Sequence, residues 1–198
     1  MNRLQRSLRR LDVEFRELGV RWALVGGLAV SIRAEPRTTR DVDVAVAVSD
    51  DREAEILVRS LRSRGYSDLP SGAVIEQTDR GRLATVRLVS PEPSDEGLVV
   101  DLLFASSGIE PDIVARADRI QVLSSTFVPV ARTGHLLALK LLAGRDQDWA
   151  DLRSLIAVAK EEDLELCRKA IAQIRERGFQ RDKDLDRDLE RLLGSPEH

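Results

Sequence analysis

Apolar residues near the start of the chain recur at the spacing of a helix. They are Leu4, Leu8, Leu11, Phe15 and Leu18, and the steps between them alternate between four and three residues. This spacing places them on one side of a helix. Gly19 follows directly and is a typical helix end. We therefore expect an amphipathic helix over residues 2–18.

The chain up to residue 131 alternates between strand and helix patterns. Apolar or alternating runs predict strands at residues 21–25, 42–48, 74–77, 83–89 and 98–104, and a pair of short strands within 120–130. Helix patterns cover residues 28–34, 51–65 and 109–117, the second of them preceded by the capping residues Ser49 and Asp50. A turn at Asp79–Gly81 and a polar loop at Ser90–Gly97 connect strands.

From residue 132 the pattern is helical to the end of the chain. Helices are expected at residues 133–144, 147–159, 163–177 and 182–193. The order of elements predicts an α/β (α+β) fold, with a small mixed β-sheet, flanking helices and a C-terminal helical bundle. We expect two domains, an α/β core with the N-terminal helix over residues 1–131 and a helical region over residues 132–198.

The composition narrows the classes of function. The 198 residues are 42% hydrophobic and 33% charged, which supports one compact domain or a core with a small helical appendage. The net charge of −3 and the pI near 5.6 argue against a nucleic-acid coat protein and a polybasic membrane binder. Residues 1–40 nevertheless contain nine arginines and four acidic residues. This basic start fits an anionic partner and a solvated helix face equally well.

Few residues of the chain are suited to a transition metal. The single cysteine, Cys167, excludes an internal disulfide and a cysteine-rich zinc site, and two histidines exclude a multi-histidine site. Any metal must be held mainly by carboxylates, which favours Mg²⁺ or Mn²⁺. No apolar run approaches the ~20 residues of a membrane span, and the N-terminus lacks a signal-peptide pattern. We therefore expect a cytoplasmic protein without a membrane segment.

A strand that ends in two glycines is the first candidate for chemistry. Leu24 and Val25 lead into Gly26 and Gly27, and a helix follows. Glycines let the backbone approach a ligand, and the free N–H groups at a helix N-terminus suit a phosphate. Taken alone, the pair is more typical of a tight turn.

Three aspartates can meet near this bend. Asp41 and Asp43 stand two residues apart at the start of an apolar strand, so their side chains share one face. Asp101 interrupts the apolar run 98–104, where a charge is costly unless it is paired or bound to a metal. If the two strands are neighbours, the three carboxylates converge and can hold two Mg²⁺ ions. One ion would activate an attacking hydroxyl, and the other would hold a nucleoside triphosphate and its pyrophosphate leaving group.

The joint pattern resembles the nucleotidyltransferase superfamily of the DNA polymerase β type. It consists of Gly26–Gly27, thirteen further residues, Asp41-Val42-Asp43, and Asp101 in a later strand. Within the superfamily the chain is most similar to the AbiEii-type toxins of type IV toxin–antitoxin systems. Their motif Arg-x-Thr-x-Asp-h-Asp, in which h is apolar, matches residues 37–43. A later helix with Lys, Arg and an Asp pair matches Lys140, Arg145, Asp148 and Asp151.

The resemblance implies a nucleotidyltransferase core and a role for each matched residue. The catalytic residues and metal ligands would be Asp41, Asp43 and Asp101, the last serving as ligand or as base for the acceptor hydroxyl. The nucleotide-binding residues would be Gly26, Gly27, Arg37, Thr39, Lys140, Arg145 and Asp148. The glycines would cradle the triphosphate, and Lys140 would neutralise a phosphate.

Several of these residues also have structural interpretations. Lys140 lies in an apolar helix and could extend to solvent, and Arg145 and Asp148 have the spacing of an i, i+3 ion pair. His135 and Cys167 are expected to be structural rather than catalytic.

The function implied by the resemblance is that of an enzyme with Mg²⁺ or Mn²⁺ as cofactor. It would transfer a nucleoside monophosphate from an NTP to an acceptor hydroxyl. The acceptor would be an RNA, in particular the 3′ end of a tRNA, and the partner an antitoxin. The alternatives are a small-molecule acceptor, as in antibiotic-modifying enzymes, and a non-catalytic nucleotide-binding module of the same fold. The module is favoured if Asp101 faces solvent or Asp41 lies in an internal salt bridge.

Overall fold

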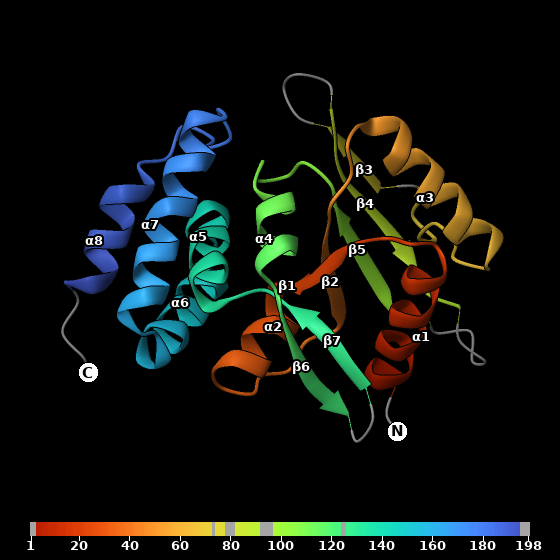
Figure 1. Ribbon diagram of the computed structural model, residues 1–198, viewed down its shortest axis with the longest axis horizontal. Coiled ribbons are helices and arrows are strands. Elements are labelled where there is room, and N and C mark those ends of the chain that lie inside the picture. The colour runs from red at the N-terminus through yellow and green to blue at the C-terminus, as the bar shows by residue number, and fades with distance from the viewer. Residues whose placement is uncertain (1–2, 73, 78–81, 92–96, 124–125, 195–198) are drawn as a thin grey trace.

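The computed structural model describes residues 3–72, 74–77, 82–91, 97–123 and 126–194 (Figure 1). Its strands are β1 (Trp22–Val25), β2 (Asp41–Val46), β3 (Val74–Gln77), β4 (Leu83–Val89), β5 (Val99–Leu103), β6 (Asp118–Leu123) and β7 (Thr126–Val130). Its helices are α1 (Arg3–Glu17), α2 (Gly26–Arg33), α3 (Asp51–Ser63), α4 (Glu110–Arg116), α5 (Thr133–Ala143), α6 (Asp146–Val158), α7 (Glu161–Glu176) and α8 (Leu185–Leu193).

The expected elements and the expected fold class are confirmed, with small differences at the ends of elements. The helix α2 begins at Gly26 instead of Leu28, so both glycines belong to its first turn. Asp50 caps α3 as expected, because its carboxylate accepts a hydrogen bond from the Glu53 amide at 2.9 Å. The expected turn Asp79–Gly81 and residues 92–96 of the expected loop lie outside the described residues. No described helix combines the length and hydrophobicity of a membrane span.

A mixed sheet lies at the centre of the molecule. Within the described residues it has seven strands in the order β3-β4-β5-β2-β1-β7-β6. The strand β2 is antiparallel to β1 and parallel to β5, which places Asp43 in register with Asp101. The strands β4 and β5 are antiparallel, and Arg87 lies opposite Asp101. Residues that pair across strands project to the same face, so Arg87, Asp43 and Asp101 meet on one side of the sheet.

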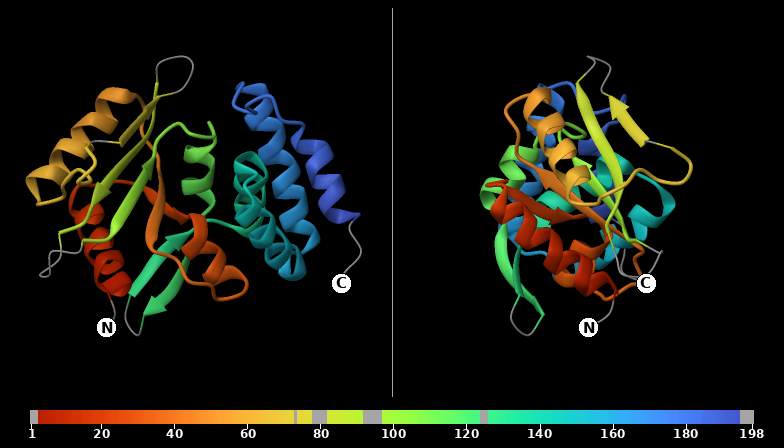
Figure 2. Two further views of the ribbon diagram at one scale, coloured as in Figure 1. Left: turned by 180° about the vertical axis from the view of Figure 1, so that it is seen from behind. Right: turned by 90° about the vertical axis from the view of Figure 1, so that its right-hand side faces the viewer.

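The two faces of the sheet have different surroundings. Val42 and Val44 of β2 are fully buried on the face that α1 and α3 cover (Figure 2). Asp41 and Asp43 alternate with them and project to the opposite face. There, a cavity lies between the sheet and the C-terminal helices α5 and α6. The fold therefore directs the aspartates of β2 into this cavity.

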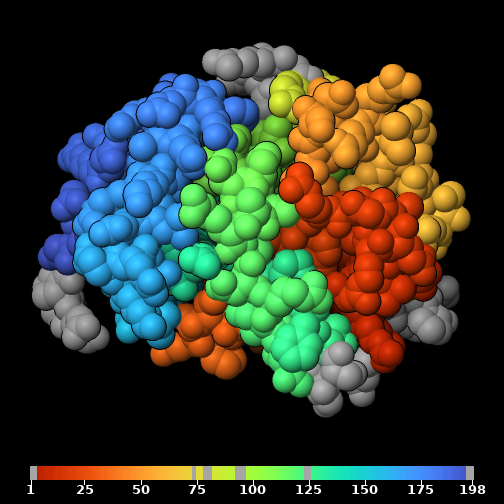
Figure 3. Space-filling model, in the orientation of Figure 1, coloured from red at the N-terminus to blue at the C-terminus, as the bar shows by residue number. Residues whose placement is uncertain are grey.

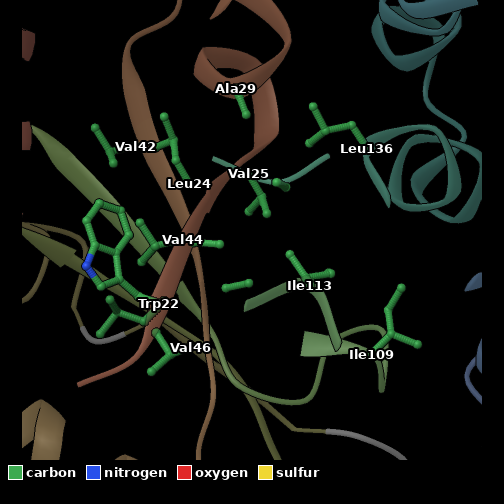
Figure 4. Packing of buried hydrophobic residues seen from close by; sticks show 14 of the residues in the cluster. Trp22, Leu24, Val25, Ala29, Val42, Val44, Val46, Ile109, Ile113 and Leu136 are labelled. Carbon is green, nitrogen blue, oxygen red and sulfur yellow. The ribbon is translucent and has the colours of Figure 1, made fainter. Parts of the chain in front are cut away.

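A continuous, mostly aliphatic core joins the sheet to the helices. Figure 4 shows Trp22, Leu24 and Val44 on one side of β1 and β2. On the other side, Val25 of β1 lies near Ile113 of α4 and Leu136 of α5. In the space-filling view, α4 fills the space between the C-terminal helices and α1 (Figure 3). The expected domain boundary after residue 131 falls just before α5. The division of the chain into two domains stays a prediction.

Candidate active site

The bend at Gly26 brings the start of α2 against the aspartates of β2. Gly26 has a φ of +64°, which L side chains rarely adopt, and a Cβ there would overlap the carboxylate of Asp43. A Cβ at Gly27 would overlap the guanidinium of Arg37. The two glycines therefore let Asp43 and Arg37 approach the first turn of α2 closely.

Asp41 and Asp43 form a pair of carboxylates beside this turn. The Thr39 hydroxyl donates a hydrogen bond of 2.9 Å to Oδ1 of Asp41, and Asp41 forms no salt bridge among the described residues. Burial, together with the negative charges of Asp41 and Asp101, raises the pKa of Asp43 to about 7. A carboxylate with such a pKa is not balanced by the protein's own cations, and a bound cation would relieve the repulsion.

Asp101 is buried, as its place in an apolar strand predicts, and it is paired with Arg87. The guanidinium of Arg87 donates two hydrogen bonds of 2.6 Å, from Nε to Oδ1 and from Nη2 to Oδ2 of Asp101. This bidentate pair raises the pKa of Arg87. Sequence reasoning found Asp101 but missed Arg87. The only signal in the sequence is that Arg87 alternates with the apolar residues Val86 and Leu88 of the same strand.

Asp41 and Asp43 offer a donor set for a divalent cation, and the expected binding of two Mg²⁺ ions stays a prediction. No group of three His, Cys, Asp or Glu side chains in the described part of the chain is arranged to hold a metal ion. Mg²⁺ is commonly bound by one or two carboxylates together with substrate phosphates. The pair Asp41 and Asp43 matches that donor set, whereas both oxygens of Asp101 accept hydrogen bonds from Arg87. The role of Asp101 as a metal ligand stays a prediction.

A group of charged side chains beside the aspartates, named here the ionic cluster, ties α5 and α6 to the segment between α2 and β2. Its members are Arg37, Lys140, Arg145, Asp148 and Asp151. Nζ of Lys140 lies 2.8 Å from Oδ1 of Asp148 and 2.8 Å from Oδ2 of Asp151. Arg37 pairs with Asp151 at 2.7 Å, and Arg145 pairs with Asp148 at 2.8 Å. The cluster thus links residues more than 100 positions apart in the sequence.

The contacts within the ionic cluster test two expectations, that Lys140 extends to solvent and that Arg145 and Asp148 form an ion pair. Lys140 does not extend to solvent, because its side chain is only 8% exposed and donates to two carboxylates. The i, i+3 ion pair of Arg145 and Asp148 is confirmed. Burial alone would raise the pKa of Asp148, but hydrogen bonds from Arg145 and Lys140 lower it to about 2. Whether Lys140, Arg145 and Asp148 also bind nucleotide stays a prediction.

A cavity of about 410 Å³ collects most of the expected site residues. Its lining contains Gly26, Gly27, Arg37, Asp41, Asp43, Asp101, Lys140, Arg145 and Asp148. Thr39 does not line the cavity but orients Asp41. Sequence reasoning missed further polar residues of the lining, which are Glu76, Thr85, Arg87, Ser106, Ser107, Gln147 and Arg181. They come from β3, β4, α6 and loops, so only the three-dimensional arrangement brings them to the site.

A second cavity of about 1100 Å³ adjoins the first one and shares Glu76, Ser106 and Arg181 with it. The segment between α7 and α8 forms one of its walls. Nη2 of Arg181 donates a hydrogen bond of 2.9 Å to the carbonyl of Ser106, which joins this segment to the loop after β5.

The other residues singled out in the sequence lie away from the aspartates of β2. The basic helix α1 packs on the opposite face of the sheet (Figure 2), so its arginines do not face the cavity. Cys167 is fully buried, and burial raises the pKa of its thiol to about 12. His135 is buried at the start of α5, and burial lowers its pKa to about 4. Both residues are buried, which agrees with the structural role expected for each.

Comparisons with known proteins agree with this arrangement. A family model described as "Nucleotidyl transferase AbiEii toxin, Type IV TA system" matches residues 6–197. No curated protein sequence matches the chain. An antigenic nucleotidyltransferase-like protein from Paracoccidioides brasiliensis is 19% identical, with 96% of this chain and 92% of that chain covered and a TM-score of 0.53. The antibiotic-resistance factor ANT(2'')-Ia is 16% identical, with 96% and 97% covered and a TM-score of 0.54. At these identities the likeness to the solved structures shows a shared fold.

Proposed function

The chain belongs to the AbiEii nucleotidyl transferase toxins of type IV toxin–antitoxin systems, and from this premise we propose that it transfers a nucleoside monophosphate from an NTP to an acceptor hydroxyl. The observation that carries the proposal is the meeting of Asp41 and Asp43 with the first turn of α2 at one cavity. The alternative of a non-catalytic module loses support, because Asp101 is buried and Asp41 forms no salt bridge among the described residues.

In this reaction the protein mainly positions the two substrates and neutralises the charge of the phosphates. The oxygen of the acceptor hydroxyl forms a bond to the α-phosphorus of the NTP. The bond between that phosphorus and the oxygen bridging to the β-phosphate breaks, and pyrophosphate leaves with the electron pair. The hydroxyl proton passes to water in the open cavity. Positive charge and N–H groups around the phosphates stabilise the transition state.

Asp41 and Asp43 would hold the divalent cation, Mg²⁺ or Mn²⁺, with Thr39 fixing the rotamer of Asp41. When bound, the cation neutralises phosphate charge and orients the triphosphate. The backbone N–H groups of Gly26 and Gly27, at the N-terminus of α2, would face the phosphates.

The ionic cluster would support the site without binding the cation itself. Lys140 lowers the pKa of Asp43 through its positive charge, although its ammonium donates to Asp148 and Asp151. Arg37 contacts Gly27 and pairs with Asp151, which fixes the first turn of α2 against α6. We assign these side chains to positioning the phosphate-binding turn and to long-range neutralisation.

The acceptor is proposed to be an RNA, in particular the 3′ end of a tRNA, and an antitoxin is the proposed partner, as for the family. The adjoining cavity of about 1100 Å³ gives an acceptor access to the aspartates. Arginines and acidic residues are equally numerous in its lining, so charge alone does not select a polyanion. A small molecule is the alternative acceptor, and ANT(2'')-Ia, which shares the fold, is known in complex with adenylyl-2''-tobramycin.

Incubation with each α-labelled NTP, Mg²⁺ and total RNA tests the proposal. We expect label in tRNA with the wild-type protein and a loss of at least about 100-fold for Asp41→Asn, since removing a metal ligand removes the cation. The matched control is Glu55→Gln, which removes one negative charge from an exposed position of α3 and should leave the transfer unchanged.

Three other outcomes would redirect the assignment. Label that appears only in added hydroxyl-bearing antibiotics would assign a small-molecule acceptor. Label in no acceptor, with NTP binding that ignores both Mg²⁺ and Asp43→Asn, would establish the non-catalytic module. Label in tRNA that survives Asp41→Asn would show that the reaction occurs elsewhere.

A further inference from the structure

Arg87 holds a position at the site that the family motifs do not assign. It lies on β4, and both carboxylate oxygens of Asp101 on β5 accept hydrogen bonds from it at 2.6 Å. The side chain of Asp101 is 7% exposed, whereas that of Arg87 is 40% exposed. The pair therefore has one buried member and one member that faces the cavity.

The bidentate pair leaves Arg87 with donors to spare. A guanidinium has five N–H donors, and the two hydrogen bonds to Asp101 use two of them. Among the described residues Arg87 forms no hydrogen bond or salt bridge except those with Asp101, and it interacts with Asp41 and Asp43 only through charge. The three remaining donors belong to a group that lines the same cavity as Gly26, Asp41 and Asp43. A rigid planar fork of this kind matches the geometry of phosphate.

The balance of charges at the site also favours a phosphate as the ligand of Arg87. Asp41, Asp43 and Asp101 bring three negative charges, and Asp101 is neutralised by Arg87. The two charges that remain on Asp41 and Asp43 balance one divalent cation. A second cation at Asp101 would have to displace two charge-assisted hydrogen bonds.

We propose that Arg87 binds the phosphate chain of the nucleotide and that Asp101 is its positioning residue, which leaves Asp41 and Asp43 as the carboxylate ligands of a single divalent cation. This inference deepens the proposed function and rests on it. Arg87 supplies at the phosphates the positive charge that a second cation would otherwise supply. Asp101 fixes the orientation of the guanidinium without contacting the nucleotide.

Two binding measurements test this assignment without turnover. The first is calorimetric titration with inorganic tripolyphosphate in Mg²⁺, a probe with a phosphate chain and no base. We expect Arg87→Ala to weaken its binding by about 10- to 100-fold, the range for loss of a charge-assisted bidentate contact. Arg87→Lys should recover part of the affinity, because lysine restores the charge but not the fork. Asp101→Asn should weaken binding by about 3- to 10-fold, since the amide oxygen can accept only one of the two bonds.

The second measurement is Mn²⁺ binding by electron paramagnetic resonance in the absence of phosphates. We expect Asp101→Asn to bind Mn²⁺ as the wild type does, and Asp41→Asn to lose it. The control for both measurements is Arg62→Ala, which removes an arginine that pairs with Asp68 and lines neither of the two cavities. It should change neither affinity. If circular dichroism shows that Arg87→Ala is unfolded, the wild type is compared with Arg87→Lys and Asp101→Asn instead.

The two measurements distinguish a failure of the roles assigned to Arg87 and Asp101 from a failure of the proposed function. Unchanged tripolyphosphate affinity in Arg87→Ala or Arg87→Lys overturns the role of Arg87. A loss of Mn²⁺ binding in Asp101→Asn as deep as in Asp41→Asn shows that Asp101 is a metal ligand and also overturns the inference. In both cases the proposed function stands if Asp41→Asn loses the binding of tripolyphosphate. Wild-type protein that binds neither probe removes the proposed function and the inference together.

Discussion

At the scale of single residues, Gly26 is the position where the backbone constrains the site most directly. We expect Gly26→Ala to lose on the order of 1–3 kcal/mol of unfolding free energy from its positive φ, and to lose Mn²⁺ binding because the new methyl displaces Asp43. Gly19 is the matched control, with a φ of +67° and nothing within 4 Å of the added Cβ. Gly19→Ala should share the backbone strain and keep the metal. Denaturant unfolding and Mn²⁺ titration measure the two effects, and equal Mn²⁺ affinity in both variants would contradict the role of Gly26.

Asp43 is expected to reduce the stability of the metal-free protein. Its pKa is raised from 3.8 to about 7, so the stabilising effect of the protonated form is complete below pH 4 and is lost as pH rises through 7. Asp43→Asn should therefore raise the unfolding free energy at pH 8 in EDTA, on the order of 1–3 kcal/mol, while abolishing transfer. At pH 4 the gain should vanish. Urea unfolding at the two pH values measures the difference, and a destabilised variant at pH 8 would refute the repulsion argument.

The residues of the site differ in how far the sequence could predict them. Asp41 and Asp43 share a face by the period of a single strand, and Asp101 stands out as a charge in an apolar run, so local pattern suffices for all three. Arg87 has no such mark. Its importance comes from lying opposite Asp101, and that register depends on how two strands pair. The pairing is a property of the folded sheet, which the pattern of one strand does not encode.

At the scale of elements, the periodicity of apolar residues predicted the positions of the helices and strands. Where the start of an element differs from the prediction, tertiary contacts are the cause. The glycine pair was expected to precede a helix that starts at Leu28, since glycine weakens a helix. In the structure α2 starts at Gly26, because the close approach of Asp43 and Arg37 requires glycine in this first turn. The same contacts explain why two adjacent glycines stand where intrinsic propensity disfavours them.

The ionic cluster is expected to contribute to stability through its buried members. Lys140→Met would leave Asp148 and Asp151 buried with one fewer partner, and we expect it to cost about 3–5 kcal/mol of unfolding free energy. Arg145→Ala should cost less than about 1 kcal/mol, because the Arg145 side chain is 75% exposed. Urea unfolding compares the two variants. Equal losses would show that the burial of Lys140 does not decide its contribution.

At the scale of the whole molecule, the cavity depends on contacts between distant segments. Arg37 pairs with Asp151, and Arg181 donates to the carbonyl of Ser106. These contacts set the C-terminal helices against the sheet and so form both cavities. The sequence predicted the order of the elements, but it carries no local signal for which helix covers which face. For that reason Glu76, Ser106 and Arg181 could not be predicted as lining residues.

The stability of the whole molecule is expected to decline in acid because of His135. Burial lowers its pKa from 6.5 to about 4, an effect to which Arg116 and Arg132 add and which Asp112 opposes. The unfolded chain therefore binds more protons than the native protein between pH 6.5 and 4, so the unfolding free energy falls as pH decreases through this window. The loss from this residue should reach about 3 kcal/mol by pH 4 and then remain constant. His135→Phe fills a similar volume and cannot be protonated, so its urea midpoint should exceed that of the wild type at pH 4.5. The advantage should be much smaller at pH 7.5, and an equal advantage at both pH values would mean that packing, not protonation, is responsible.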